Sequence, residues 1–209
     1  MAGTLEKLAK VTAQAVEAHQ AGQSDKAERL FRKAAAMKPP QPQALYNLGV
    51  FLRQAGKPRE ALAAFNKVLT ASPDHLGALV ESGFARLSLS DIELAVGLFS
   101  QALEISPEDP DALAGLAQSA FQAGDWERSV AGYENLARQT GLGEEAQLIR
   151  IRALLETGRA DQARSLVTML GQARPALAGD LLKAVTRRAR GGFSLNEEKL
   201  ANELGISVS

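Results

Sequence analysis

The chain has 209 residues, of which 45% are hydrophobic, 23% charged and 5% aromatic. Basic and acidic side chains balance at 24 each, so no overall charge favours nucleic acid or an anionic membrane surface. The absence of cysteine excludes disulfide bonds, and no window reaches the roughly 18 apolar residues of a membrane-spanning helix. We therefore expect a cytoplasmic protein without membrane insertion.

The balanced total hides an uneven distribution of charge along the chain. Residues 1–75 carry 11 basic and 6 acidic side chains, residues 76–143 carry 3 and 10, and residues 144–209 carry 10 and 8. A region with an excess of one sign attracts partners of the opposite sign. The middle of the chain is therefore expected to favour basic partners.

A 34-residue period runs through the chain and predicts pairs of helices. Its first column is a turn position, occupied by Gly22, Gly56, Ser90, Gly124 and Gly158. Five residues later stands a small side chain, in Ala27, Ala61, Ala95, Ser129 and Ala163. Nine residues after the turn stands a large one, in Phe31, Phe65, Phe99, Tyr133 and Val167. The fourth column, seventeen residues after the turn, contains Pro39, Pro73, Pro107, Gly141 and Pro175.

Each column has a mechanical reason in a pair of antiparallel helices. Glycine allows a tight turn because it adopts a positive φ angle at little cost. The small side chains let the second helix lie close to the first, and the large ones fill the space between neighbouring pairs. Proline cannot continue a helix, so it marks the boundary before the next pair. The first helices carry their own 34-residue column of small residues, in Ala15, Gly49, Gly83 and Ala117.

This pattern resembles that of the tetratricopeptide repeat family. The resemblance is carried most closely by Leu45, Leu48, Gly49, Ala61, Phe65 and Pro73. It implies an all-α fold: a right-handed α-solenoid of five 34-residue helix-turn-helix repeats with a C-terminal capping helix. The expected units are 8–41, 42–75, 76–109, 110–143 and 144–177. The fifth departs from the family pattern, because Gln147 and Ile151 stand where a large apolar and a small residue are expected.

Residues 178–190 fit the helix that covers the last repeat of such a stack. Leu181, Leu182 and Val185 are expected to face the preceding repeat, while Lys183, Arg187, Arg188 and Arg190 face water. The repeat domain would then span 1–190, and 191–209 would form a short helical tail. Ser194 and Glu197 form the Ser-x-x-Glu capping box of the tail helix.

The sequence offers no constellation for catalysis, so we expect that the protein is not an enzyme. Its two histidines, His19 and His75, lack further ligands at metal-binding spacing, and His75 reads as a solvated residue at a helix start. No glycine-rich loop follows a strand, as phosphate binding would require. The arginines near residue 190 have no aromatic stacking platform beside them, which disfavours nucleic acid. No cofactor or metal is expected.

The resemblance implies that the first helix of each unit lines a concave groove that binds another protein or peptide. The expected partner-binding residues are Tyr46, Asn47, Val50, Arg53, Val80, Glu81, Phe84, Leu87, Gln118 and Phe121. Leu87 and Phe121 could instead be buried between helices, because they lie late in theirs. The predicted function is an adaptor or assembly scaffold that binds a partner helix or extended apolar segment in this groove. The alternative is a self-associating scaffold, a homo-oligomer in which residues 193–206 fill the groove of their own or a neighbouring molecule.

Overall fold

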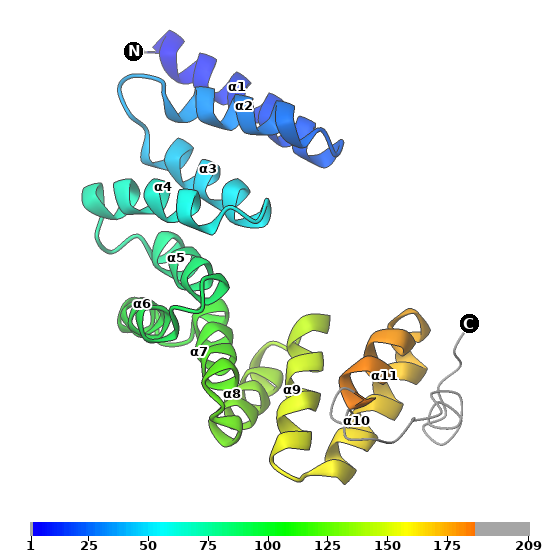
Figure 1. Ribbon diagram of the computed structural model, residues 1–209. Coiled ribbons are helices and arrows are strands. Elements are labelled where there is room, and N and C mark those ends of the chain that lie inside the picture. The colour runs from blue at the N-terminus through cyan, green and yellow to red at the C-terminus, as the bar shows by residue number, and fades with distance from the viewer. Residues whose placement is uncertain (1, 187–209) are drawn as a thin grey trace. The chain divides into compact units, whose positions relative to one another are not determined.

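The computed structural model describes residues 2–186, and these residues contain helices and turns but no strand (Figure 1). The chain divides into two compact units, with the boundary between Gly115 and Leu116 inside one helix. Unit 1 contains α1 (Ala2–Gln20), α2 (Ser24–Ala35), α3 (Pro42–Gln54), α4 (Pro58–Ala71), α5 (Leu76–Ser88), α6 (Ile92–Ile105) and the start of α7 (Pro110–Ala123). Unit 2 contains the end of α7, α8 (Trp126–Gln139), α9 (Glu144–Glu156), α10 (Ala160–Ala173), the 3-10 helix η1 (Pro175–Leu177) and α11 (Ala178–Thr186).

Helices that follow one another in the chain also pack against one another. In unit 1, α1 packs on α2, α3 on α4 and α5 on α6, and these pairs are joined by contacts of α2 with α3 and of α4 with α5. Such stacking of similar helix pairs is the arrangement of an α-solenoid. The prediction of an all-α fold built from consecutive helix pairs is confirmed.

The turn column of the sequence adopts the backbone conformation that glycine favours. The φ angles are 70° at Gly22, 72° at Gly56, 79° at Gly124 and 77° at Gly158. Ser90 takes the same conformation with φ 62°, although it has a side chain. The turn prediction therefore holds at Ser90 as well, at the cost of backbone strain.

Replacing Ser90 with glycine is expected to stabilise the protein by about 0.5–1 kcal/mol. The substitution removes the steric penalty of a positive φ angle, which outweighs the greater flexibility that glycine gives the unfolded chain. Urea denaturation followed by circular dichroism measures the change. Ser100→Gly is the matched control: Ser100 lies on the exposed side of α6, where glycine should destabilise by a similar amount. Equal effects of the two changes would contradict the strain at Ser90.

Aromatic rings and glycines of the repeat columns fit together in unit 1. A Cβ atom added to Gly49 would lie 2.4 Å from the ring of Phe65, and one added to Gly83 would lie 2.6 Å from the ring of Phe99. The same Phe99 ring would be 2.3 Å from a Cβ on Gly115, in the next first helix. Phe99 thus fills the space between the α5–α6 pair and α7. The predicted role of the large column as filler between neighbouring pairs is confirmed here.

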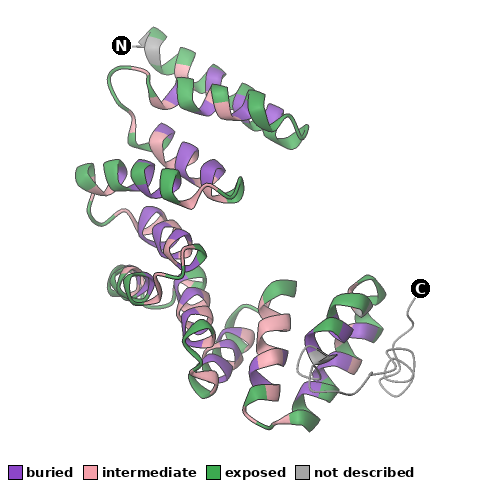
Figure 2. Ribbon diagram, in the orientation of Figure 1, coloured by how far each residue is buried: buried purple, intermediate pink, exposed green. Residues whose placement is uncertain are grey.

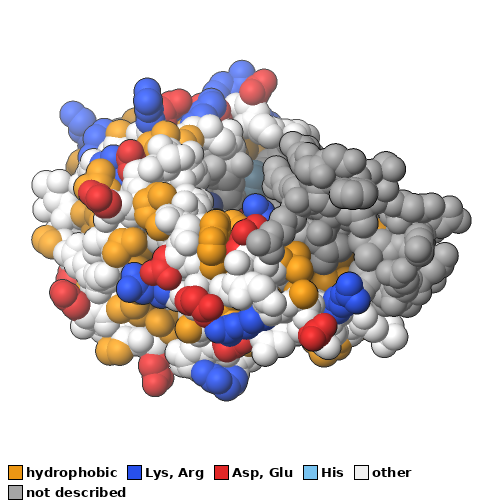
Figure 3. Space-filling view, turned by 60° about the horizontal axis from the view of Figure 1, so that its bottom comes forward, with side chains coloured by type: hydrophobic (Ala, Val, Ile, Leu, Met, Phe, Trp, Pro, Cys, Tyr) orange, Lys and Arg blue, Asp and Glu red, His pale blue; other side chains and the backbone are white. Residues whose placement is uncertain are grey.

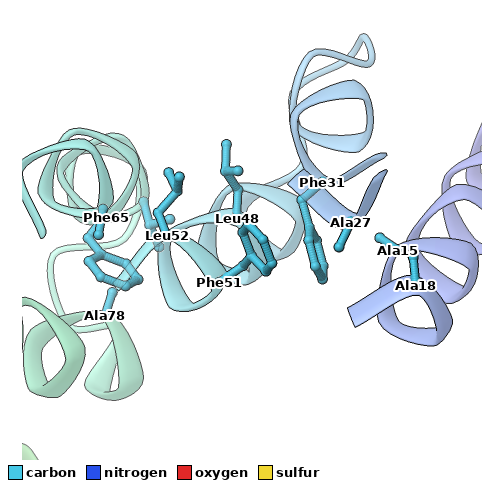
Figure 4. Close-up of a cluster of buried hydrophobic side chains, with 11 residues drawn as sticks. Ala15, Ala18, Ala27, Phe31, Leu48, Phe51, Leu52, Phe65 and Ala78 are labelled. Atoms are coloured by element: carbon cyan, nitrogen blue, oxygen red, sulfur yellow. The ribbon is translucent and has the colours of Figure 1, made fainter. Parts of the chain in front are cut away.

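The core of unit 1 continues across successive helix pairs. Figure 4 shows Ala15 and Ala18 of α1 and Ala27 of α2 on one side of Phe31. The ring centroid of Phe31 lies 5.1 Å from that of Phe51 in α3. In the same cluster, Leu48, Leu52, Phe65 and Ala78 extend the contacts through α4 to α5. One apolar layer therefore joins α1 to α5.

Ion pairs connect neighbouring helix pairs on the surface of unit 1. The Lys57 ammonium lies 2.8 Å from the Glu28 carboxylate, and Arg32 contacts Glu60 at 2.6 Å. The hydrogen bond from Lys57, together with one from Arg32, holds the pKa of Glu28 below its ordinary value. The pairs join α2 to α4 and to the turn before it.

Unit 2 has its own core, in which α9 contacts α8, α10 and α11. Ile151 is fully buried in this core together with Val167, Leu181 and Leu182. The departure of Ile151 from the family pattern is therefore accommodated inside the fold. Leu181 and Leu182 of α11 are buried and Lys183 is exposed, as predicted. The predictions for the Val185 side chain, for Arg187, Arg188 and Arg190, and for the tail at 191–209 lie outside the described residues.

Candidate partner-binding surface

Eight of the predicted partner-binding residues lie on the adjacent helices α3 and α5 of unit 1, and six of these are half-buried. On α3 the spacing of three and four residues places side chains on one helical face. The same holds for the two residues on α5. We call this set the α3–α5 surface. It consists of Tyr46, Asn47, Val50, Arg53, Glu81 and Phe84.

Val80 and Leu87 do not belong to this surface, which corrects the sequence prediction. Their side chains are only 6% and 3% exposed. The reason is that α5 is covered from several sides, by α3, α4 and α6, so most of its circumference faces the core. Figure 2 shows most of α5 in the colours of buried and intermediate residues. For Leu87, burial between helices was the alternative already open from the sequence.

Tyr46 is held in place by groups that precede and begin α5. Its ring centroid lies 5.2 Å from that of His75. Its hydroxyl oxygen lies 3.0 Å from the point where a Cβ of Gly77 would stand, so a side chain at this position would crowd the phenol. His75 also caps α5, because its Nδ1 accepts a hydrogen bond of 3.1 Å from the Ala78 amide. His75 is therefore not simply solvated, as the sequence suggested; it positions Tyr46.

Phe84 is held from two directions. Its ring centroid lies 5.0 Å from that of Phe99, edge to face. On the other side, the Arg53 guanidinium lies 5.7 Å from the Phe84 centroid, within the range of a cation–π contact. Arg53 also forms an ion pair with Glu81, which ties α3 to α5. Both aromatic side chains of the α3–α5 surface are therefore fixed by contacts within the chain.

The charged groups around Tyr46 act on its phenol. Burial raises the pKa of Tyr46, and the negative charge of Glu81 raises it further. The Arg53 charge opposes this shift, while the Asp111 carboxylate, in the first turn of α7, adds to it. Asn47 lies beside Tyr46 in the chain, and its Oδ1 accepts a hydrogen bond of 2.9 Å from Gln43. Aromatic rings and charged groups thus occur together on the α3–α5 surface. The effect of Asp111 on Tyr46 was not predicted from the sequence.

The remaining predicted residues, Gln118 and Phe121, lie in unit 2. The Phe121 ring centroid lies 5.0 Å from the ring of Trp126, and the Arg152 guanidinium lies 4.7 Å from the Phe121 centroid. Phe121 also packs against the unit 2 core. Its aromatic contacts thus favour the packing alternative that the sequence left open, and Gln118 is half-buried beside it in α7.

Charge in unit 1 changes sign between α4 and α5. Residues 1–71 carry 11 basic and 5 acidic side chains, whereas residues 72–115 carry 8 acidic ones and a single basic one, Arg86. Figure 3 shows acidic, basic and hydrophobic side chains intermixed on the face drawn there. The α3–α5 surface lies where the basic part meets the acidic part.

Within residues 2–186, no group of three or more His, Asp or Glu side chains is arranged to hold a metal ion. None of the helices in this part of the chain combines the length and apolar character needed to span a bilayer. The described histidines make structural contacts: His19 lies edge-on to Phe51 with ring centroids 5.4 Å apart, and His75 contacts Tyr46.

Comparisons with known proteins agree with this architecture. One family model described as tetratricopeptide repeat matches residues 12–76, 52–110 and 114–178, and a second model of the same description matches 86–141. The fold is similar to that of a thermophilic tetratricopeptide repeat protein of Thermus thermophilus, with a TM-score of 0.72 and 19% identity over 85% of this chain and 98% of that one.

The fold is also similar to that of the type IV pilus biogenesis factor PilW, with a TM-score of 0.74 and 23% identity over 86% of this chain and 83% of that one. A tetratricopeptide repeat protein from Parabacteroides merdae is similar as well, with a TM-score of 0.68 and 17% identity over 98% of this chain and 82% of that one. A comparison with curated proteins gave no match. Since the family models cover well over half of the sequence, the chain belongs to the tetratricopeptide repeat family.

Proposed function

We propose that this protein is an adaptor or assembly scaffold that binds a helix or an extended apolar segment of a partner protein on the α3–α5 surface. Tetratricopeptide repeat proteins are generally non-catalytic scaffolds that bind other proteins or peptides. The observation that supports this site is the pair of half-buried aromatic side chains, Tyr46 and Phe84, on adjacent helices. The Phe84 ring contacts Arg53, which is paired with Glu81, and the charges of both residues act on the pKa of Tyr46.

The way these rings are held suits them to binding. Aromatic side chains contribute much of the free energy of association at protein interfaces. Tyr46 is fixed by His75 and Gly77, and Phe84 by Phe99 and Arg53. Side chains that are already ordered lose little conformational entropy when a partner binds. The surface therefore offers apolar area at a low entropic cost.

Replacing Tyr46 and Phe84 together by alanine is expected to reduce partner capture at least about tenfold, because each removes an aromatic contact of the kind that dominates binding. The measurement is affinity capture from cell extract with the full chain as bait, with bound proteins quantified by mass spectrometry. The matched control is Leu94→Ala with Ile105→Ala, which removes apolar side chains that are 55% and 43% exposed on α6. Proteins lost with the first variant and kept with the control are partners of the α3–α5 surface.

Both aromatic residues also touch the core, so the double variant should melt at a lower temperature than the wild type. Circular dichroism at the capture temperature separates loss of binding from loss of folding, and Asn47→Ala provides a milder change on the same surface. If the α6 control removes the captured proteins and the Tyr46 and Phe84 variant keeps them, the partner binds α6 and the proposal is wrong.

A further inference from the structure

The second helix pair of unit 1, α3–α4, has a face that receives the preceding helix α2. The Phe51 ring lies 5.1 Å from a phenylalanine ring of α2, measured between centroids (Figure 4). Lys57, in the turn before α4, lies 2.8 Å from Glu28, and Glu60 on α4 lies 2.6 Å from Arg32. Phe51, Lys57 and Glu60 therefore mark the face on which the second helix of the preceding pair docks.

The same face of the first pair, α1–α2, is an open groove. The residues that stand 34 positions before those three are Glu17, Gln23 and Lys26. All of them line a groove of about 490 Å³ between α1 and α2. In the described part of the chain, the main contacts of these two helices are with each other and with α3. By the register of the repeat, this α1–α2 groove takes the position of a helix-binding face.

The charge at this face is reversed in the first pair. Glu60 binds Arg32 of the docked α2, whereas the residue at the same place in the groove is Lys26. Arg29 and Lys33 also line the groove, and their spacing of three and four residues places the three cations on one face of α2. The ion pairs found for α2 among the described residues use other side chains of this helix. A helix that docks here can thus form the corresponding ion pair only with an acidic side chain.

The other lining residues favour a protein helix over other anionic partners. Ala18 is 3% exposed and Leu30 is half-buried, so the groove offers apolar contacts between its charges. None of the described lining residues is aromatic, which disfavours single-stranded nucleic acid. Glu17 is the one carboxylate among them, against three cations. A concave surface with apolar and basic parts fits an amphipathic acidic helix better than a flat bilayer.

We propose that the α1–α2 groove is a second docking site, which binds an acidic amphipathic helix of a partner protein. The carboxylates of that helix pair with Lys26, Arg29 and Lys33, and its apolar side chains contact Ala18 and Leu30. No residue of the α3–α5 surface lines this groove, so the inference does not depend on the function proposed for that surface.

Selection from a displayed peptide library tests the inference. The random peptides are about 16 residues long, enough for about four helical turns. The full chain is the bait, and peptides that still bind the Lys26→Glu, Arg29→Glu, Lys33→Glu variant are removed. We expect the survivors to carry aspartate or glutamate at spacings of three and four residues, with apolar residues beside them. Neutral or basic survivors, or none beyond background, would overturn the inference.

A second charge variant separates the groove from the general charge of the protein. Lys38→Glu, Arg59→Glu, Lys67→Glu makes the same change of net charge at exposed positions outside the groove. By fluorescence anisotropy, the survivors should bind this control nearly as well as the wild type and should lose at least about tenfold on the groove variant. All six side chains are exposed, so circular dichroism should show both variants folded. Equal losses for the two variants would overturn the assignment to the groove.

Two further measurements test the ion pair at Lys26 and the class of partner. Lys26→Glu alone should weaken the survivors about two- to fivefold, the usual effect of one exposed ion pair. Replacing one carboxylate of the peptide by lysine should then restore binding to this variant, and no restoring position would overturn the pairing. Sedimentation with vesicles of phosphatidylserine and phosphatidylcholine tests a bilayer as the partner. Vesicle binding that is lost only in the groove variant, without acidic survivors in the selection, would overturn the proposal.

Discussion

Replacing Phe99 by alanine should lower the free energy of unfolding by about 3–5 kcal/mol, the usual cost of deleting a buried phenylalanine ring. Phe99 is fully buried, and its ring lies against Gly83 on α5 and Gly115 on α7. Removing it leaves a cavity between two helix pairs. Neither glycine has a side chain that could move into the space, so little of the loss can be recovered by relaxation.

Urea denaturation measures the total loss, and hydrogen exchange resolved by peptide shows where it falls. Protection should decrease first in α5, α6 and the start of α7, because Phe99 joins these helices. Leu94→Ala in the same helix is the control: Leu94 is 55% exposed, so its effect should stay within about 0.5 kcal/mol. A loss for Phe99→Ala as small as that of the control would contradict its role as the filler between pairs.

Replacing Ile151 by alanine should cost about 2–5 kcal/mol. Ile151 is fully buried in the unit 2 core, at the position where α3 and α5 have Gly49 and Gly83. Sixteen residues after Gly49 and Gly83, on the second helix of each pair, stands a phenylalanine of the large column. Sixteen residues after Ile151 stands Val167. A glycine and a phenylalanine are thus replaced by two aliphatic side chains of similar size. Both are fully buried in the unit 2 core, so the departure from the family pattern is accommodated there.

This exchange can be tested by restoring the usual order. Val167→Phe alone should destabilise by about 1–3 kcal/mol through overpacking. Combined with Ile151→Ala it should cost less than the sum of the two changes, since each makes room for the other. Thermal and urea unfolding of the two single variants and the double variant complete the cycle. Strict additivity would show that the two side chains do not share one space.

The fold was predictable because the constraints that determine it repeat every 34 residues. Each turn needs a positive φ angle, so glycine recurs at the turn position, as at Gly56 and Gly124. Each large ring needs space in the neighbouring helix, so glycine also recurs opposite it, as at Gly49 opposite Phe65. Position 90 has serine instead of glycine, and its place in the 34-residue period still predicted the turn correctly. The burial of Ile151 could also have been predicted, because the column of large residues has the smaller Val167 in the same repeat.

The surface was only partly predictable, because exposure depends on neighbours that do not repeat. Tyr46 and Phe84 are half-buried, whereas Val80 is buried because three other helices pack around α5. Asp111, whose charge raises the pKa of Tyr46, lies 65 positions after Tyr46 in the chain. No local spacing reveals such a pair. His75 was recognised as a residue at a helix start, but its ring contact with Tyr46 appears only in three dimensions.

The contacts between helices in unit 1 have a consequence for how the protein can change. The main helix contacts found among the described residues of unit 1 join helices one or two places apart in the chain. The acidic α5–α6 pair is connected to its neighbours through contacts between glycines and aromatic rings. The same kind of contact occurs between Gly49 and Phe65 in the preceding pair. A helix pair of different charge could therefore replace α5–α6 and change the charge of the α3–α5 surface, while the packing positions that join neighbouring pairs stay the same.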